Sequence, residues 1–226
     1  NIYRETEDWG TLTELLISRA EISPDPLVKV ASLQGAAKVF EQKIGDLDNA
    51  FVVLQAAFNV DYSNEDTSRE LERLATIANK WGDLLNEYNG IVTQIPDPIE
   101  QSELWVKIGR WYGEHLDRPD YGIQALKKAL ALNSSSVNAL RELVSFYKRG
   151  NQAVDLAATL ERLVPLEQDP EIKAKVLLHL AEVQENGLRD TNAAISSYRR
   201  VLQVNSESIV ALDALARLHE SLGQAE

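Results

Sequence analysis

The fold is decided by residues 97–132, which read DPIEQSELWVKIGRWYGEHLDRPDYGIQALKKALAL. Asp97 followed by Pro98 is typical of a helix start. The carboxylate can accept a hydrogen bond from an unpaired backbone N–H, and proline fits the first helical position. The apolar residues that follow recur at helical spacing, and strand-like alternation is nowhere sustained. This stretch therefore predicts a pair of consecutive helices.

The same signal recurs along the chain at a fixed period. Asp-Pro occurs only at Asp25-Pro26, Asp97-Pro98 and Asp169-Pro170, and these dipeptides stand 72 residues apart. The same offset, without gaps, aligns columns of apolar residues. These columns include Leu33, Trp105 and Leu177; Ala36, Ile108 and Leu180; Leu54, Leu126 and Tyr198; Leu71, Leu143 and Leu215; and Leu74, Phe146 and Leu218. A gapless internal period of this length predicts a repeat protein.

Each 72-residue unit holds four predicted helices, which form two hairpins of about 36 residues. We expect helices at residues 7–22, 27–44, 47–60, 64–78, 82–95, 99–116, 119–132, 136–148, 151–164, 171–187, 190–204 and 208–222. A single hairpin cannot bury its apolar face alone, so stacked hairpins make the core. The prediction is one solenoid over residues 1–226, interpreted as a fragment of a longer array. Its units are 27–98, 99–170 and an incomplete 171–226, preceded by a partial unit 1–26.

The best-matching hairpin resembles the tetratricopeptide repeat. That motif places a large apolar residue, an apolar-small pair and an aromatic on one helix, and small, large and small residues on the next. The matching residues are Trp105, Ile108-Gly109, Tyr112, Gly122, Leu126 and Ala129. The hairpins beginning near Leu33 and Leu177 match too, although Gln184 replaces the aromatic, and the alternate hairpins match less well. The resemblance implies an all-α fold, a right-handed α/α superhelix of about six stacked helix hairpins.

Composition narrows the classes of function. The net charge of −12 disfavours a broad nucleic-acid-binding surface. No apolar run approaches the length of a membrane span, so we expect a soluble protein without direct membrane insertion. Its compartment stays open, with the cytoplasm slightly favoured. The chain has no cysteine, which excludes thiolate chemistry, and His115, His179 and His219 fall in three different repeat columns. We therefore predict no metal site, no cofactor and no catalytic residue.

Two other groups of residues have alternative interpretations. Glu41, Glu114 or Glu182 could form an acid–base pair, as in helical-toroid glycosidases. A helical-toroid enzyme is therefore the distant alternative function. Trp9 and Trp81 begin equivalent helices and could anchor a partner, but we favour packing of both indoles against neighbouring hairpins. Trp111 is expected in the core.

A basic stripe is the candidate binding site. In the resembling family the first, or inner, helix of each hairpin lines a concave groove. The inner-helix positions that we expect there carry Lys38, Arg69, Arg73, Arg110 and Arg141. Such a stripe on an acidic body would suit an acidic peptide, because arginine makes forked contacts with carboxylates. The favoured alternative is neutralisation of the stripe by Glu70, Glu103 or Glu142 on adjacent turns.

The sequence thus favours a non-catalytic protein-interaction scaffold with a partner peptide or helix in its groove. The rival is an architectural spacer that associates end to end within a larger assembly. Leu212, Leu215 and Leu218 are expected on one uncovered face of the last inner helix, which favours further repeats or another chain against it.

Overall fold

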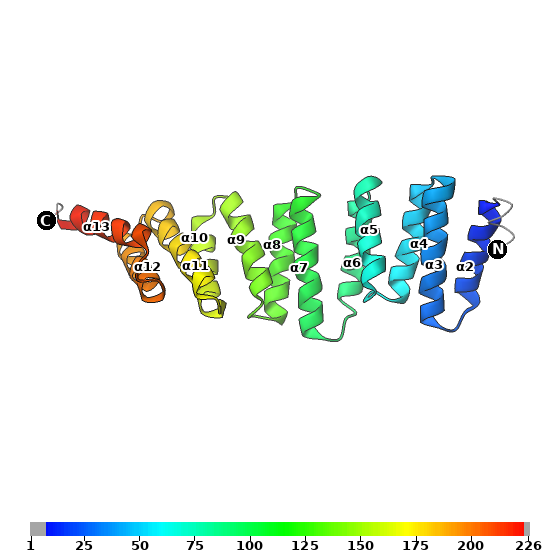
Figure 1. Cartoon of the computed structure of the whole chain (residues 1–226), viewed down its shortest axis with the longest axis horizontal. Coiled ribbons are helices and arrows are strands. Elements are labelled where there is room, and N and C mark those ends of the chain that lie inside the picture. The colour runs from blue at the N-terminus through cyan, green and yellow to red at the C-terminus, as the bar shows by residue number, and fades with distance from the viewer. Residues whose placement is uncertain (1–7, 224–226) are drawn as a thin grey trace. The chain divides into compact units, whose positions relative to one another are not determined.

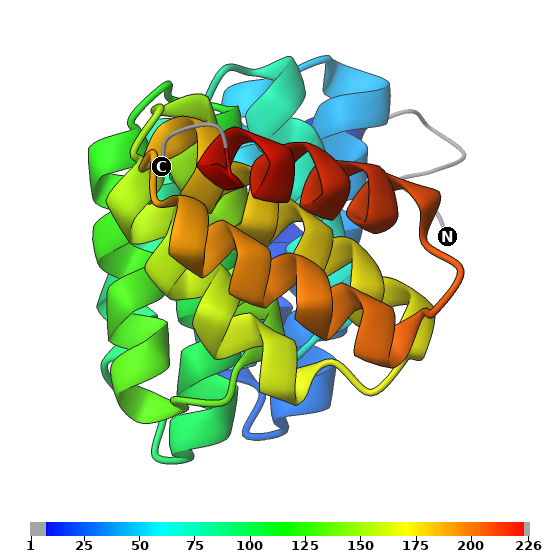
Figure 2. The same ribbon diagram turned by 90° about the vertical axis from the view of Figure 1, so that its left-hand side faces the viewer.

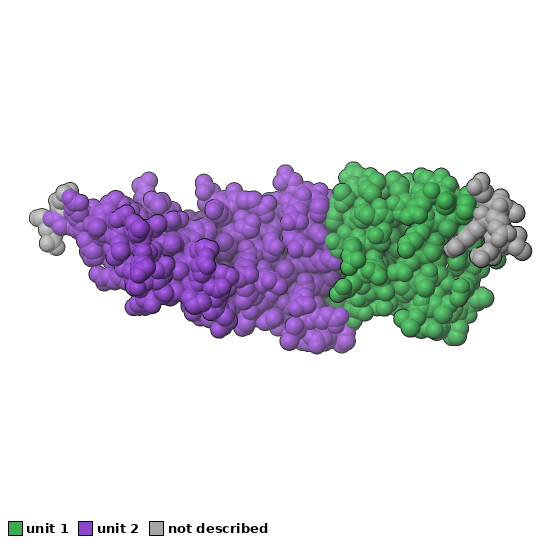
Figure 3. Space-filling model, viewed as in Figure 1, with its two compact units in different colours: residues 1–95 green, residues 96–226 purple. Residues whose placement is uncertain are grey.

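The computed structural model describes residues 8–223, in which helices are joined by turns and loops and no strand occurs. The predicted all-α class is therefore confirmed. The chain divides into two compact units, residues 1–95 and 96–226, coloured separately in Figure 3. Parts of two predicted repeat units lie outside the described residues, namely 1–7 and 224–226.

The first unit consists of consecutive helices joined by short loops (Figure 1). Its elements are α2 (Trp9–Ile22), α3 (Pro26–Val39), a π-helical turn η1 (Phe40–Ile44), α4 (Leu47–Val60), α5 (Glu65–Ile77) and α6 (Trp81–Val92). Each α-helix packs against the next one along the chain. The helices α3 and α5 are the inner helices of this unit, and α4 and α6 are its outer helices.

The second unit continues the same alternation of inner and outer helices. Its elements are α7 (Pro98–Glu114), α8 (Pro119–Leu132), α9 (Val137–Arg149), α10 (Ala153–Leu163), a 3₁₀ turn η2 (Val164–Leu166), α11 (Pro170–Glu182), a π-helical turn η3 (Val183–Gly187), α12 (Thr191–Val204) and α13 (Ile209–Gly223). The inner helices α7 and α9 also contact each other directly.

The Asp-Pro dipeptides start helices α3, α7 and α11, as predicted. Asp25, Asp97 and Asp169 are the N-cap residues, and in each case proline is the first helical residue. Each aspartate accepts a hydrogen bond from the backbone N–H two residues later, at 2.9, 2.7 and 2.8 Å respectively. The cap satisfies one of the free N–H groups at the helix start.

The 72-residue period extends to the backbone of the turns. Gly45, Asp117 and Arg189 stand one period apart, and all three adopt the left-handed conformation, with φ of 79°, 50° and 56°. Asn79 and Asn151 form a second such column, with φ of 55° and 56°. Only the first of these five positions carries glycine. Asn79, Asp117 and Asn151 are of the types that tolerate this conformation best after glycine, so the repeat imposes an unfavourable backbone only on Arg189.

Close packing within a hairpin explains the small residues of the motif. A Cβ atom on Gly109 of α7 would lie 2.8 Å from Leu126 Cγ and 3.1 Å from the Gly122 carbonyl oxygen of α8. These two helices can therefore approach as they do only with glycine at their crossing. Trp81 and Trp111 are buried, which confirms packing as their role, and Trp9 is partly buried.

The prediction that Leu212, Leu215 and Leu218 share one uncovered face of α13 is wrong in one respect. Leu212 is 48% exposed, but Leu218 is only 5% exposed and Leu215 packs against the same core. Leu218 occupies the column of Leu74 and Phe146, whose members are all buried. Packing of α13 against α12 therefore buries part of the face that we expected to be uncovered.

Candidate partner-binding grooves

Each unit has a groove between two inner helices. Groove A lies between α3 and α5 of the first unit and has a volume of about 270 Å³. Groove A is lined by Gln34, Ala37, Lys38, Glu41, Leu54, Asp66, Arg69, Glu70 and Leu74. Groove B lies between α7 and α9 of the second unit and has a volume of about 680 Å³. Groove B is lined by Glu103, Val106, Lys107, Arg110, Asn133, Ser135, Ser136, Val137, Asn138, Arg141 and Glu142.

The two grooves occupy the same register of the repeat. Five residues that line groove A have counterparts one 72-residue period later that line groove B. The pairs are Gln34 and Val106, Lys38 and Arg110, Asp66 and Asn138, Arg69 and Arg141, and Glu70 and Glu142. The groove is therefore a property of the repeat and not of one irregular loop.

Four of the five predicted cations line these grooves. Lys38 and Arg69 line groove A, and Arg110 and Arg141 line groove B. Arg73 lies outside the lining of groove A but binds Glu41, which is part of it. That all five face one concave surface stays a prediction.

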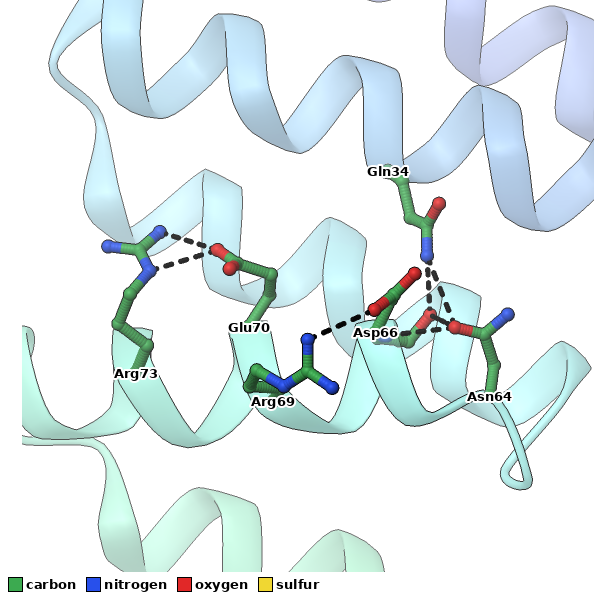
Figure 4. Close-up of polar contacts among 7 residues, drawn as sticks. Gln34, Asn64, Asp66, Arg69, Glu70 and Arg73 are labelled. Atoms are coloured by element: carbon green, nitrogen blue, oxygen red, sulfur yellow. Dashed lines mark hydrogen bonds and ion pairs between the residues drawn. The ribbon is translucent and has the colours of Figure 1, made fainter.

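Arg73 is held by two carboxylates. Its Nη1 and Nη2 donate to the two oxygens of Glu41, in the turn η1, at 2.7 and 2.6 Å. Its Nε donates to Glu70 at 2.9 Å, a contact on the same helix that Figure 4 shows. Hydrogen bonds to Glu41 and then Glu70 raise the pKa of Arg73. Because the guanidinium already makes these contacts, Arg73 is a structural residue and a weak candidate for binding a partner.

The other cations of groove A are more accessible. Arg69 contacts Asp66 at 3.2 Å on the same helix (Figure 4), but both side chains are mostly exposed, so the pair contributes little. Lys38 is exposed, and no ion pair involves it among residues 8–223. Gln34, one turn before Lys38, donates to Thr67 Oγ1 at 2.9 Å and so ties α3 to α5. Lys38 is therefore the cation of groove A that forms no ion pair within the described residues.

The two arginines of groove B also differ in how firmly an internal carboxylate holds them. Arg141 donates to both oxygens of Glu167 at 3.0 and 2.8 Å, and Glu167 is only 5% exposed. Arg110 contacts Glu114 at 3.9 Å, and both side chains are about half exposed. Glu142 lies nearby, and its pKa is raised by burial and by Glu114, against the opposing effect of Arg110. Arg141 therefore has a structural contact, whereas Arg110 remains available.

Groove B also contains groups that can bind a polypeptide backbone. Asn138 is exposed at the start of α9, beside Ser135 in the preceding turn. Val106 and Val137 add an apolar surface to the same groove. Amide and hydroxyl groups beside aliphatic ones suit an extended or helical peptide, which presents both polar and apolar atoms.

The neutralising carboxylates were identified only in part from the sequence. Glu70 contacts Arg73 as expected, whereas Glu103 and Glu142 line groove B. The stronger contacts come from Glu41 and Glu167, which lie on neighbouring elements. The sequence also allows Glu41 as half of an acid–base pair, but its carboxylate binds Arg73.

The described residues lack both a metal-binding cluster and a helix that could span a membrane. Within the described part of the chain, no group of three or more His, Asp or Glu side chains is arranged to hold a metal ion. Over the same residues, every helix falls short of the length and apolarity needed to cross a bilayer.

Comparison with known proteins gives matches at the level of structure only. No protein-family model matches the sequence, and no curated protein matches it. Solved structures similar to this chain include MamA, at 16% identity over 88% of this chain and 94% of that chain, with a TM-score of 0.49. They also include YrrB, described as a tetratricopeptide repeat protein with an unusual peptide-binding site. YrrB is 13% identical over 89% of this chain and 96% of its own, with a TM-score of 0.49.

A third solved structure, PilF of Pseudomonas aeruginosa, is 16% identical over 95% of this chain and 92% of that chain, with a TM-score of 0.47. The repeat columns, the paired helices and the small residues at their crossings agree on one architecture. The fold is a tetratricopeptide-like helical repeat. The fold by itself names no partner, because such packing requirements are independent of ligand.

Proposed function

We propose that this chain is a non-catalytic protein-interaction scaffold, which binds a partner peptide or helix through grooves A and B. One observation carries the proposal: the two grooves recur at the same register, and each keeps an accessible cation, Lys38 or Arg110. Core packing does not require a cation at an exposed position, so the recurrence favours recognition. A scaffold of this kind needs no reacting group in the groove.

The partner's chemistry follows from the charges that remain accessible. Arg73 and Arg141 are held in internal ion pairs, so the grooves do not favour a uniformly acidic ligand. A peptide with isolated acidic residues fits better, with one carboxylate against Lys38 or Arg110 and its backbone near Asn138. Charged contacts at exposed positions affect specificity and association rate more than affinity.

A peptide-display selection on the full chain tests this proposal. Selected peptides are then titrated against the wild type, Lys38→Gln, Arg110→Gln and the double variant. The control is Lys127→Gln, because Lys127 is exposed on the outer helix α8. We expect the double variant to associate more slowly and to bind about three- to tenfold more weakly, with the control unchanged and the wild type weakened by salt. Equal binding by the wild type and the double variant would exclude the grooves.

The architectural spacer remains a second candidate, because Arg73 and Arg141 are engaged in internal ion pairs. Its test is sedimentation velocity over a range of protein concentrations. A spacer that associates through α13 should form oligomers in a concentration-dependent way, and Leu212→Glu should abolish them. A monomer at all concentrations would leave the groove-binding scaffold as the better description.

A further inference from the structure

A third pocket lies between α12 and α13 and shares no lining residue with either groove. Its volume is about 390 Å³, and its apolar walls include Ile195 and Leu222. Figure 2 looks onto these two helices, which pack against each other. The polar residues that line the pocket are Asn192, Ser196, Arg199, Arg200, Gln203 and His219. We call it the α12–α13 pocket.

The charge of this pocket is opposite to that of the chain. Of the residues 8–223, no Asp or Glu lines it, although the chain carries a net charge of −12. Arg200 is engaged by Glu161, whose two oxygens lie 2.9 and 2.8 Å from its Nη1. Arg199 forms no salt bridge within the described residues, and its Nη2 lies 3.3 Å from His219 Nε2. Two basic groups are thus in contact without a carboxylate between them.

Two arrangements of protons are compatible with this contact. In the first, a neutral His219 accepts a hydrogen bond from Arg199. In the second, both nitrogens carry a proton and donate to an anion seated beside them, which replaces the direct contact. The second arrangement also uses the amide and hydroxyl groups of Asn192, Ser196 and Gln203, which the first leaves to solvent.

The residues of this pocket can be compared with their counterparts one 72-residue period earlier, to distinguish positions needed for packing from those that differ. Ile195 corresponds to Ile123, so this part of the apolar wall recurs, whereas Leu222 corresponds to Gly150. The polar positions change: Asp120 is replaced by Asn192, and Tyr147 is replaced by His219. These changes remove an acid and add an imidazole, and the recurring isoleucine does not require either of them.

We propose that the α12–α13 pocket binds a phosphate-type dianion, either free phosphate or a phosphate monoester. The planar guanidinium of Arg199 matches the geometry of a tetrahedral oxyanion, and His219 supplies a second nitrogen donor. A phosphate group presents at least three acceptor oxygens, which suits the number of donors around the pocket. This proposal is independent of grooves A and B.

NMR of the histidine rings in the full chain tests the proposal directly. The sequence has only three histidines, so Arg199→Gln and His219→Gln variants suffice to assign and test the signal of His219. The ligands are inorganic phosphate, N-acetyl phosphoserine amide and N-acetyl aspartate amide, at low salt and about pH 7, where phosphate is close to a dianion. The matched control is Lys127→Gln, because Lys127 occupies the position of Arg199 one repeat earlier.

We expect a saturable shift of the His219 signal with phosphate or phosphoserine, and at least tenfold weaker binding of the aspartate derivative. Arg199→Gln should weaken phosphate binding at least tenfold, and Lys127→Gln should not. A stronger response to phosphoserine than to phosphate would identify a monoester as the ligand. A shift that does not saturate, or one that Arg199→Gln leaves unchanged, would overturn the proposal. Both outcomes are independent of peptide binding in the grooves.

Discussion

The carboxylate of Glu41 accepts two hydrogen bonds from the guanidinium of Arg73, and the pair Glu185 and Arg217 repeats this contact two 72-residue periods later. In both cases the glutamate lies in a π-helical turn at the end of one inner helix, and the arginine lies on the next inner helix. The ion pair is therefore a repeated structural link between consecutive hairpins.

The middle repeat replaces this ion pair with an aromatic contact. The equivalent positions there are Gly113 and Ser145, which cannot form an ion pair. A Cβ atom on Gly113 would lie 2.4 Å from the ring of Phe146, so the ring fills this space. The corresponding residues of the other repeats are Leu74 and Leu218, which are smaller. Charge pairing and ring packing are thus alternative ways of joining adjacent inner helices.

Arg73→Ala should destabilise the first unit by about 1–2 kcal/mol, because it leaves Glu41, which is mostly buried, without its partner. The control is Arg69→Ala, which removes an exposed pair and should change stability by less than about 0.5 kcal/mol. Urea unfolding followed by circular dichroism measures both. Equal effects of the two substitutions would show that the Glu41 contact adds nothing to stability.

Gly113→Ala should destabilise the protein by about 1–3 kcal/mol through overpacking against Phe146. Phe146→Leu introduces the residue type of the other repeats and should recover part of that loss in the double variant. A double-mutant cycle measured by thermal unfolding gives the coupling between the two positions. Gly90→Ala is the control, since no atom lies within 4 Å of its added Cβ. Additive effects would contradict a direct contact.

Arg141→Ala should cost about 1–3 kcal/mol, because it leaves the buried carboxylate of Glu167 unpaired. The cost stays below that of a fully buried pair because the Arg141 side chain is half exposed. Arg110→Ala, in the same groove, should change stability by less than about 0.5 kcal/mol. If the two variants unfold at the same urea concentration, the Glu167 contact is not structural. The same comparison keeps loss of folding apart from loss of binding in groove B.

Local chemistry explains which parts of the fold the sequence could predict. The starts of α3, α7 and α11 were predictable because Asp25, Asp97 and Asp169 cap neighbouring N–H groups. The spans 27–44 and 171–187 were predicted close to their observed ends. Their final π-helical turns were not predicted, because apolar spacing does not distinguish such a turn from a regular helix.

Contacts between helices were less predictable. The sequence predicts Leu212 and Leu218 on one face of α13. Residues three apart lie about 60° apart around a helix, so these two side chains point in different directions. The partners of Arg73 and Arg141 were missed because Glu41 and Glu167 lie on other elements, and their positions depend on how those elements end. Only the recurrence of Glu41 and Arg73 as Glu185 and Arg217 in the sequence could have suggested one of these pairs.

The Glu185 contact should make part of the stability dependent on pH. Arg217 first, and then the Tyr198 hydroxyl, hold the pKa of Glu185 below its ordinary value, and the glutamate is only 12% exposed. Burial and Glu185 raise the pKa of Tyr198 to about 12, so tyrosine remains a hydrogen-bond donor at neutral pH. Because the folded pKa of Glu185 is depressed, its contribution is fully present above the unfolded value of about 4.3. That contribution is lost as the pH falls through the folded value.

Glu185→Gln should therefore lose about 1–2 kcal/mol relative to the wild type at pH 7, and the difference should shrink as the pH falls below about 4. Urea unfolding of both proteins between about pH 3 and pH 7 measures this difference. The control is Glu171→Gln, because Glu171 forms an exposed pair with Lys175 on its own helix. A constant difference between Glu185→Gln and the wild type across this range would mean that Glu185 does not act through its charge.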